Sequence, residues 1–161
     1  MIDRTARNDP VEEAGAALPT TLEHRITYLL RRVTDAAGRM ANAHLGQLGL
    51  DTRHYTVLAV VAAGGGSSQR TIADTLRLDR ATVVALVDAL EVQGLARRVQ
   101  SREDRRANAV ELTPKGRRVL KRADALMEEC EAAFVATLHE KERGQLQAIL
   151  ERLLTSTRAT P

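Results

Sequence analysis

Ten basic residues lie between Leu95 and Arg122, and eight of them are arginines. Only three acidic residues oppose them, so this stretch carries a net charge of +7, whereas the whole chain carries +3. The planar guanidinium group of arginine offers a fork of donors that suits phosphate groups and guanine edges. A concentrated positive segment in a nearly neutral protein indicates either a phosphate-binding surface or a solvated charged face.

The middle of this basic stretch is a charged loop, residues 102–108, between two short strand-like runs. The runs cover residues 96–99 and 109–112, and together they predict a β-hairpin with arginines at its tip. A two-stranded hairpin is not stable alone in water, so it must pack against neighbouring helices.

The residues before the hairpin have the spacing of a helix-turn-helix. Residues 69–76 predict a short helix, a three-residue break follows, and Asp79 caps a helix over 80–93 that Gly94 ends. The second helix of such a pair enters the major groove of duplex DNA, with its N-terminal residues nearest the bases. A helical hairpin that only packs is the alternative. The predicted DNA contacts are Gln69, Arg70, Thr71, Arg80, Ala81, Thr82, Val83, Arg102, Arg105 and Arg106.

Helical patterns flank this unit on both sides. Apolar residues recur at helical spacing from Thr21 to about residue 47, and Asp51 is a good N-cap for a helix to residue 63. Thr113-Pro114 is a strong start for a helix to about residue 138, and a last helix covers about 140–155. The sequence therefore predicts a mainly α fold with a small β-hairpin wing (α+β), preceded by a mobile N-terminal arm over residues 1–19.

The amino-acid composition disfavours several classes of binding partner and cellular location. Aromatic residues make up only 2% of the chain, which disfavours the stacking platforms that bind single strands or RNA. One cysteine, Cys130, allows no intramolecular disulfide, and no run of about eighteen apolar residues predicts a membrane span. The N-terminus has no secretory signal, so a cytoplasmic protein, nucleoid-associated when bound to DNA, is the expectation.

Nothing in the sequence points to an enzyme. The four histidines are scattered, no Cys-x-x-Cys or His-Glu-x-x-His spacing occurs, and the three glycines at 64–66 lack the Gly-Lys-Ser/Thr of a phosphate loop. We therefore expect no metal, no cofactor and no catalytic residues.

Several of these segments together resemble the MarR-type regulators. The matching stretches are residues 48–51, 55–58, 72–76, 79–83 and 87–95, and above all Asp104-Arg105-Arg106 followed by residues 110–116. The resemblance covers about residues 22–155.

This resemblance implies a homodimer that binds duplex DNA at a pseudo-palindromic operator, a repressor that a small aromatic or phenolic effector releases. It divides the chain into a helical dimerisation region, residues 20–47 and 114–157, and a winged helix-turn-helix DNA-binding domain, residues 48–113. A long first helix and two apolar terminal helices exceed what one small winged domain needs to cover, which agrees with a dimer.

The resemblance also gives roles to the wing residues. Asp104 pairs with an arginine at the wing base, either Arg98 or Arg102, and shapes the loop. Arg105 and Arg106 then lie near the tip, where one enters the minor groove and the other binds phosphate or holds the fold. The chain departs from the family at residues 84–85, a Val-Ala pair where Ser or Thr followed by Arg is common. Base readout is therefore expected to rest on Arg80, Thr82 and apolar contacts.

Family members bind effectors in a crevice between the dimer helices and the winged domain. The residues that would line it here are Tyr28, Arg31, Arg32, His54, Tyr55 and Leu58. The alternative is that Tyr55 is plain core and His54 a packed or solvent-facing residue. Cys130 follows two glutamates and lies in apolar register, so we expect a packed thiol in the core or the dimer interface rather than a redox sensor.

Two other functions remain open at this point. One is a DNA-binding regulator without a ligand, which differs in DNA affinity measured with and without phenolic compounds. The other is a helical protein-interaction dimer whose hairpin is only a surface loop, which the +7 stretch disfavours.

Overall fold

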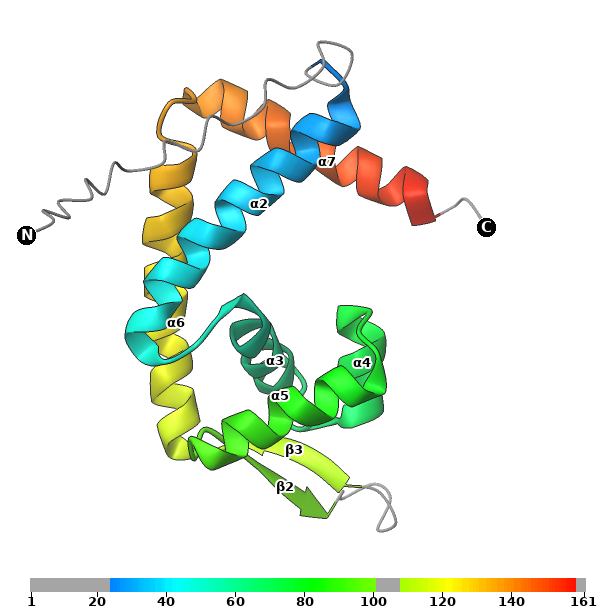
Figure 1. The fold of residues 1–161 in the computed structure, drawn as a ribbon, viewed down its shortest axis with the longest axis vertical. Coiled ribbons are helices and arrows are strands. Elements are labelled where there is room, and N and C mark those ends of the chain that lie inside the picture. Colours follow the sequence, from blue (N-terminus) through cyan, green and yellow to red (C-terminus); the bar gives the residue numbers. More distant parts are fainter. Residues whose placement is uncertain (1–23, 101–107, 159–161) are drawn as a thin grey trace, which may run out of the picture. The chain divides into compact units, whose positions relative to one another are not determined.

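The computed structural model describes residues 24–100 and 108–158 (Figure 1). The described elements are α2 (Ile26–Leu45), the 3-10 helix η1 (Gly46–Leu48), α3 (Thr52–Ala63), β1 (Ser67–Ser68), α4 (Gln69–Leu76), α5 (Arg80–Val92), β2 (Ala96–Gln100), β3 (Asn108–Leu112), α6 (Pro114–Phe134) and α7 (Glu140–Arg158). The fold is mainly α with one small antiparallel sheet, as the sequence predicts. No helix in this described part is both long and apolar enough to cross a membrane.

The chain divides into two compact units at Asp35, within α2. The first unit contributes only residues 24–35 to the described structure, and the second holds every other element. The predicted arm, residues 1–19, lies outside the described residues.

The sheet has three strands in the order β1-β3-β2, all antiparallel. Strands β2 and β3 form the predicted hairpin, with Arg98 opposite Val110. The two residues of β1 add a third strand, in which Ser67 pairs with the same Val110 from the other side. Two serines carry no strand pattern of their own, so only the pairing with a distant strand makes β1 a strand.

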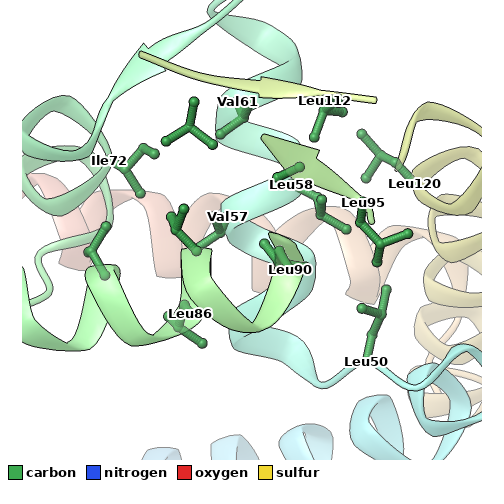
Figure 2. Close-up of a cluster of buried hydrophobic side chains, with 14 of the residues drawn as sticks. Leu50, Val57, Leu58, Val61, Ile72, Leu86, Leu90, Leu95, Leu112 and Leu120 are labelled. Carbon is green, nitrogen blue, oxygen red and sulfur yellow. The ribbon is translucent and has the colours of Figure 1, made fainter. Parts of the chain in front are cut away.

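A single apolar cluster packs α3, α4 and α5 against the sheet (Figure 2). The fully buried side chains include Val57 and Leu58 from α3, Ile72 from α4 and Leu90 from α5. The cluster also takes in residues from the end of α2 and the first turns of α6, namely Leu45, Leu120 and Ala123. The first turns of α6 thus pack in the same core as α3, α4 and α5. The predicted domain division after residue 113 stays a prediction.

Side-chain caps set where four of the helices begin. Asp51 accepts a hydrogen bond from the backbone N–H of residue 54 (2.8 Å), and Asp79 from that of residue 82 (2.8 Å). Ser68 and Thr113 cap α4 and α6 in the same way, at 3.0 and 2.9 Å. Such caps satisfy backbone donors that a helix leaves unpaired. The caps predicted at Asp51, Asp79 and Thr113 are confirmed.

The end of α5 and the start of α6 are joined by hydrogen bonds. Thr113 donates its hydroxyl to the carbonyl of Gly94 (2.7 Å) and its backbone N–H to the carbonyl of Leu95 (3.0 Å). Lys115 donates its ammonium group to the carbonyl of Gln93 (2.8 Å), beyond the last turn of α5. A cation is favourable at a helix C-terminus. These bonds hold together four elements, α5, β2, β3 and α6, which all end or begin here.

Gly116 allows α6 to approach this junction closely. A Cβ atom on Gly116 would overlap the carbonyl oxygen and carbonyl carbon of Leu95, which are backbone atoms and cannot rotate away. The close approach therefore requires glycine, although glycine weakens a helix interior.

We expect Gly116→Ala to lower the free energy of unfolding by about 2–4 kcal/mol, because the backbone must shift to admit the methyl group. Denaturant unfolding followed by circular dichroism measures this. The matched control is Gly144→Ala in α7, where a Cβ meets nothing within 4 Å. That variant should be neutral or gain about 0.5–1 kcal/mol from helix propensity. Equal stability of the two variants would contradict the prediction.

Candidate nucleic-acid interface

The first turn of α5 is held by its own cap. The Thr82 hydroxyl donates to one Asp79 oxygen (2.5 Å), and the Thr82 backbone N–H donates to the other (2.8 Å). These hydrogen bonds hold the pKa of the Asp79 carboxyl below its usual range. The hydroxyl of Thr82, predicted to contact DNA, thus has an acceptor within the protein.

The exposed face of α5 differs by one residue from the predicted one. Val83 is fully buried (0% exposed) in the core, so it cannot reach a base, and the prediction that it contacts DNA is wrong. Arg80 and Ala81 are exposed, as a DNA contact requires. Val84, the next residue along, is 40% exposed. Successive residues of an α-helix point about 100° apart, so neighbours in sequence lie on different faces.

The first turn of α4 presents two of its three predicted contacts to solvent. Arg70 is exposed and lies 3.8 Å from the Asp74 carboxylate, and Thr71 is exposed with its hydroxyl 2.8 Å from that of the capping serine. Gln69 is half-buried, and with its amide oxygen turned toward Arg98 it accepts from Nη2 (2.8 Å) and Nε (3.1 Å).

Arg98 links the first wing strand to α5. Its guanidinium contacts Asp88 (Nη2 to Oδ1, 2.6 Å) and the Glu91 carboxylate, and its backbone N–H donates to Glu91 (2.6 Å). Burial by itself would lower the pKa of Arg98, but the hydrogen bond to Asp88 and the charge of Glu91 outweigh it and raise the pKa. Arg98 therefore stays charged and holds the wing base against α5. The expected pairing with Asp104 stays a prediction, because Asp104 lies outside the described residues.

Some cations of the basic stretch bind protein groups, whereas others are exposed to solvent. Arg97 points to the other face of the sheet, where it pairs with Glu111 (3.0 Å), and Arg117 donates to the carbonyl of Leu112 (2.8 Å). Three cations on α6 are exposed and have no carboxylate partner within the described ranges, namely Arg118, Lys121 and Arg122. The predicted wing contacts Arg102, Arg105 and Arg106 fall outside those ranges.

Two predicted effector residues have protein partners in the second unit. The Tyr55 hydroxyl donates to the Asp124 carboxylate (3.0 Å), joining α3 to α6. Burial, this hydrogen bond and the charges of Asp124 and Glu128 all raise the pKa of Tyr55. The imidazole of His54 lies 2.7 Å from the capping carboxylate of α3.

Leu58 is fully buried in the apolar cluster, so it lines no crevice in this structure and its prediction as a ligand contact is wrong. The remaining predicted effector residues belong to the first unit. There the Arg31 guanidinium lies 5.4 Å from the centre of the Tyr28 ring and 3.1 Å from the Asp35 carboxylate, and Arg32 is exposed. The effector crevice stays a prediction.

Cys130 is buried, as expected of a packed thiol. Among residues 24–100 and 108–158, no group of three or more His, Cys, Asp or Glu side chains is arranged to hold a metal ion.

Apolar side chains are exposed in one row along α7. Leu146, Ile149, Leu150, Leu153 and Leu154 recur at spacings of three and four and are all exposed. A helix with such a row normally buries it against another surface. The first turns of α2 carry a similar exposed set, Ile26, Leu29, Leu30 and Val33.

Comparisons with known proteins agree on one family. A family model described as the MarR family matches residues 48–107. A regulatory protein named for the hcr operon of Thauera aromatica is 36% identical over 107 residues, which is 66% of this chain and 64% of that protein. The chain thus spans less than two thirds of that relative.

Two solved structures share this fold over most of their length. A MarR-family transcriptional regulator from Rhodococcus sp. RHA1 is 30% identical, with a TM-score of 0.72, over 80% of this chain and 91% of that one. CouR from Rhodococcus jostii RHA1, solved with p-coumaroyl-CoA bound, is 29% identical, with a TM-score of 0.74, over 84% and 95% of the two chains.

We expect Arg98→Gln to lower the free energy of unfolding by about 1–2 kcal/mol, because two carboxylates lose a partly buried, charged hydrogen-bond partner. Thermal and urea unfolding measure this. Arg97→Gln is the matched control on the same strand, since its ion pair is more exposed and such pairs are worth about 0–1 kcal/mol. A larger loss for Arg97→Gln than for Arg98→Gln would contradict this assignment.

Proposed function

The chain belongs to the MarR family of transcriptional regulators, whose members are not enzymes, and on that premise we propose that it is a homodimeric, sequence-specific regulator that binds duplex DNA. The observation that carries the proposal is the coupling of α5 to the wing through Arg98. An exposed helix N-terminus and a basic hairpin held together as one body can engage a major groove and the adjacent minor groove at once.

The proposed contacts divide into two kinds. Arg80 and Ala81 at the start of α5 face the base edges, while Arg70 and Thr71 at the start of α4 face the phosphates. The segment between β2 and β3 would add three cations, Arg102 near the wing base and Arg105 and Arg106 near the tip. Because the minor groove offers little base information, the tip contributes affinity more than base discrimination.

We expect Arg105→Ala and Arg106→Ala each to weaken binding to all duplexes. If the replaced arginine neutralises a phosphate, the slope of log Kd against log salt concentration should fall by about one. Fluorescence anisotropy with a labelled duplex, repeated across a salt series, measures both effects. Lys141→Ala, an exposed cation on α7, serves as the control and should change neither. Unchanged affinity in both arginine variants would remove the wing from the interface.

We further propose that the exposed apolar row on α7 is a dimer surface. The row has five large aliphatic side chains, and a helix with such a row normally buries it against another surface. A two-fold dimer places two winged units on a pseudo-palindrome with half-sites about one helical turn apart.

We expect Ile149→Glu to convert the dimer to a monomer, because the carboxylate would lose its hydration in an apolar interface. Sedimentation velocity reports the mass. Ala148→Glu places the same charge on the other side of α7 and should leave the dimer intact. If Ile149→Glu remains dimeric, the row on α7 is not the interface.

The proposal extends to regulation by a small aromatic or phenolic effector that releases the protein from DNA as a repressor. Its support is CouR, a relative with p-coumaroyl-CoA bound, together with the Tyr55–Asp124 hydrogen bond that joins α3 to α6. DNA affinity with and without phenolic compounds separates this from a regulator without a ligand. As duplex DNA is the proposed partner, the protein would act in the cytoplasm and associate with the nucleoid when bound.

A further inference from the structure

The exposed face of α5 offers few free hydrogen-bonding groups. The Thr82 hydroxyl donates to Asp79, and the carboxylate of Asp88 is paired with Arg98. Within the described residues, the guanidinium of Arg80 makes no hydrogen bond or ion pair with another protein group, and the residue is exposed. Arg80 is, however, the first residue of α5, so it can serve only one end of this face. Direct readout by hydrogen bonds is therefore sparse along the rest of this face.

The exposed residues that follow Arg80 are apolar. Ala81 and Val84 lie one turn apart, and Ala85 lies beside them. Val84 is 40% exposed although the preceding valine is fully buried, so part of the Val84 side chain is open to a partner. A β-branched residue also has lower helix propensity than alanine, so helix propensity does not account for valine at this position. An isopropyl group at this place gains most if it meets an apolar group on the partner.

Resting on the DNA-binding function proposed above, we infer that Val84, flanked by Ala81 and Ala85, reads the 5-methyl groups of thymines in the major groove. The thymine methyl is the apolar group that a base pair presents on its major-groove edge, and cytosine has no methyl there. Alanines on either side let the helix backbone approach the bases closely. The half-site is then thymine-containing where α5 enters it, and Val84 determines that preference.

The probe is a duplex that the wild-type protein selects from a random library, resynthesised with deoxyuridine in place of one thymine at a time. Deoxyuridine keeps the base pair and the phosphate charge and removes only the methyl group. Each contacted methyl should be worth about a fourfold change in Kd, the amount expected for burying one methyl-sized apolar group. Wild type should show this loss at one or two positions of each half-site.

Val84→Ala tests the assignment of the contact. It should abolish the deoxyuridine effect at the thymine that Val84 touches, and it should stay folded because alanine favours a helix. Val92→Ala is the matched control: Val92 is 89% exposed on the same helix, but lies about 12 Å further along it. This control should keep the full deoxyuridine effect.

The outcomes separate the two proposals. Tight, salt-dependent binding with no deoxyuridine effect at any position would overturn the methyl readout and leave DNA binding intact. A deoxyuridine effect of equal size in wild type and Val84→Ala would overturn the role of Val84. Failure to bind any duplex at low salt would overturn both the inference and the function on which it rests.

Discussion

The junction between α5 and α6 is the contact on which the arrangement of α5, the β2–β3 hairpin and α6 depends. The backbone of Leu95 accepts a hydrogen bond from Thr113 and lies against Gly116, so no side chain separates the two segments. Lys115 adds a hydrogen bond to the carbonyl of Gln93. Because α5, both long strands and α6 meet here, a shift at this point would move the wing relative to α5, the helix proposed to enter the groove.

A second link, further along the hairpin, completes this rigid unit. Arg98, in the middle of β2, binds Asp88 and Glu91 on α5, so β2 is fixed to α5 at a second place beyond the junction. Several cations of the basic stretch thus serve structure: Arg98, Arg97 and Arg117 bind protein groups, as does Lys115. The net charge of the stretch overstates how many cations are free for DNA.

Pairing of polar side chains within the protein also affects the exposed face of α5, which is proposed to contact DNA. Two polar residues of α5, Thr82 and Asp88, are paired with protein groups, Thr82 with the capping Asp79 and Asp88 with Arg98 of β2. Their hydrogen bonds stabilise the helix start and the wing, and they leave a face of alanine and valine. We therefore expect phosphate contacts to supply most of the affinity for DNA. Discrimination between DNA sequences is expected to come from DNA shape and from apolar contacts.

The sequence by itself determined the main helices, the β-hairpin and the caps at which several helices begin. Helix caps act on backbone groups only a few residues away, so they can be predicted without knowing the fold. Examples are the N-caps Asp51, Asp79 and Thr113 and the glycines that end helices. The family resemblance also rested on short segments of sequence, above all Asp104-Arg105-Arg106 followed by residues 110–116. Only the tertiary structure decided that Val83 and Leu58 are buried while Val84 is exposed, that Arg98 binds Asp88, and that Ser67 joins the sheet. These facts depend on which way a helix is rotated against its neighbours and on contacts between distant segments. A rotation of about 100° per residue separates a core side chain from a DNA contact, and packing alone sets it.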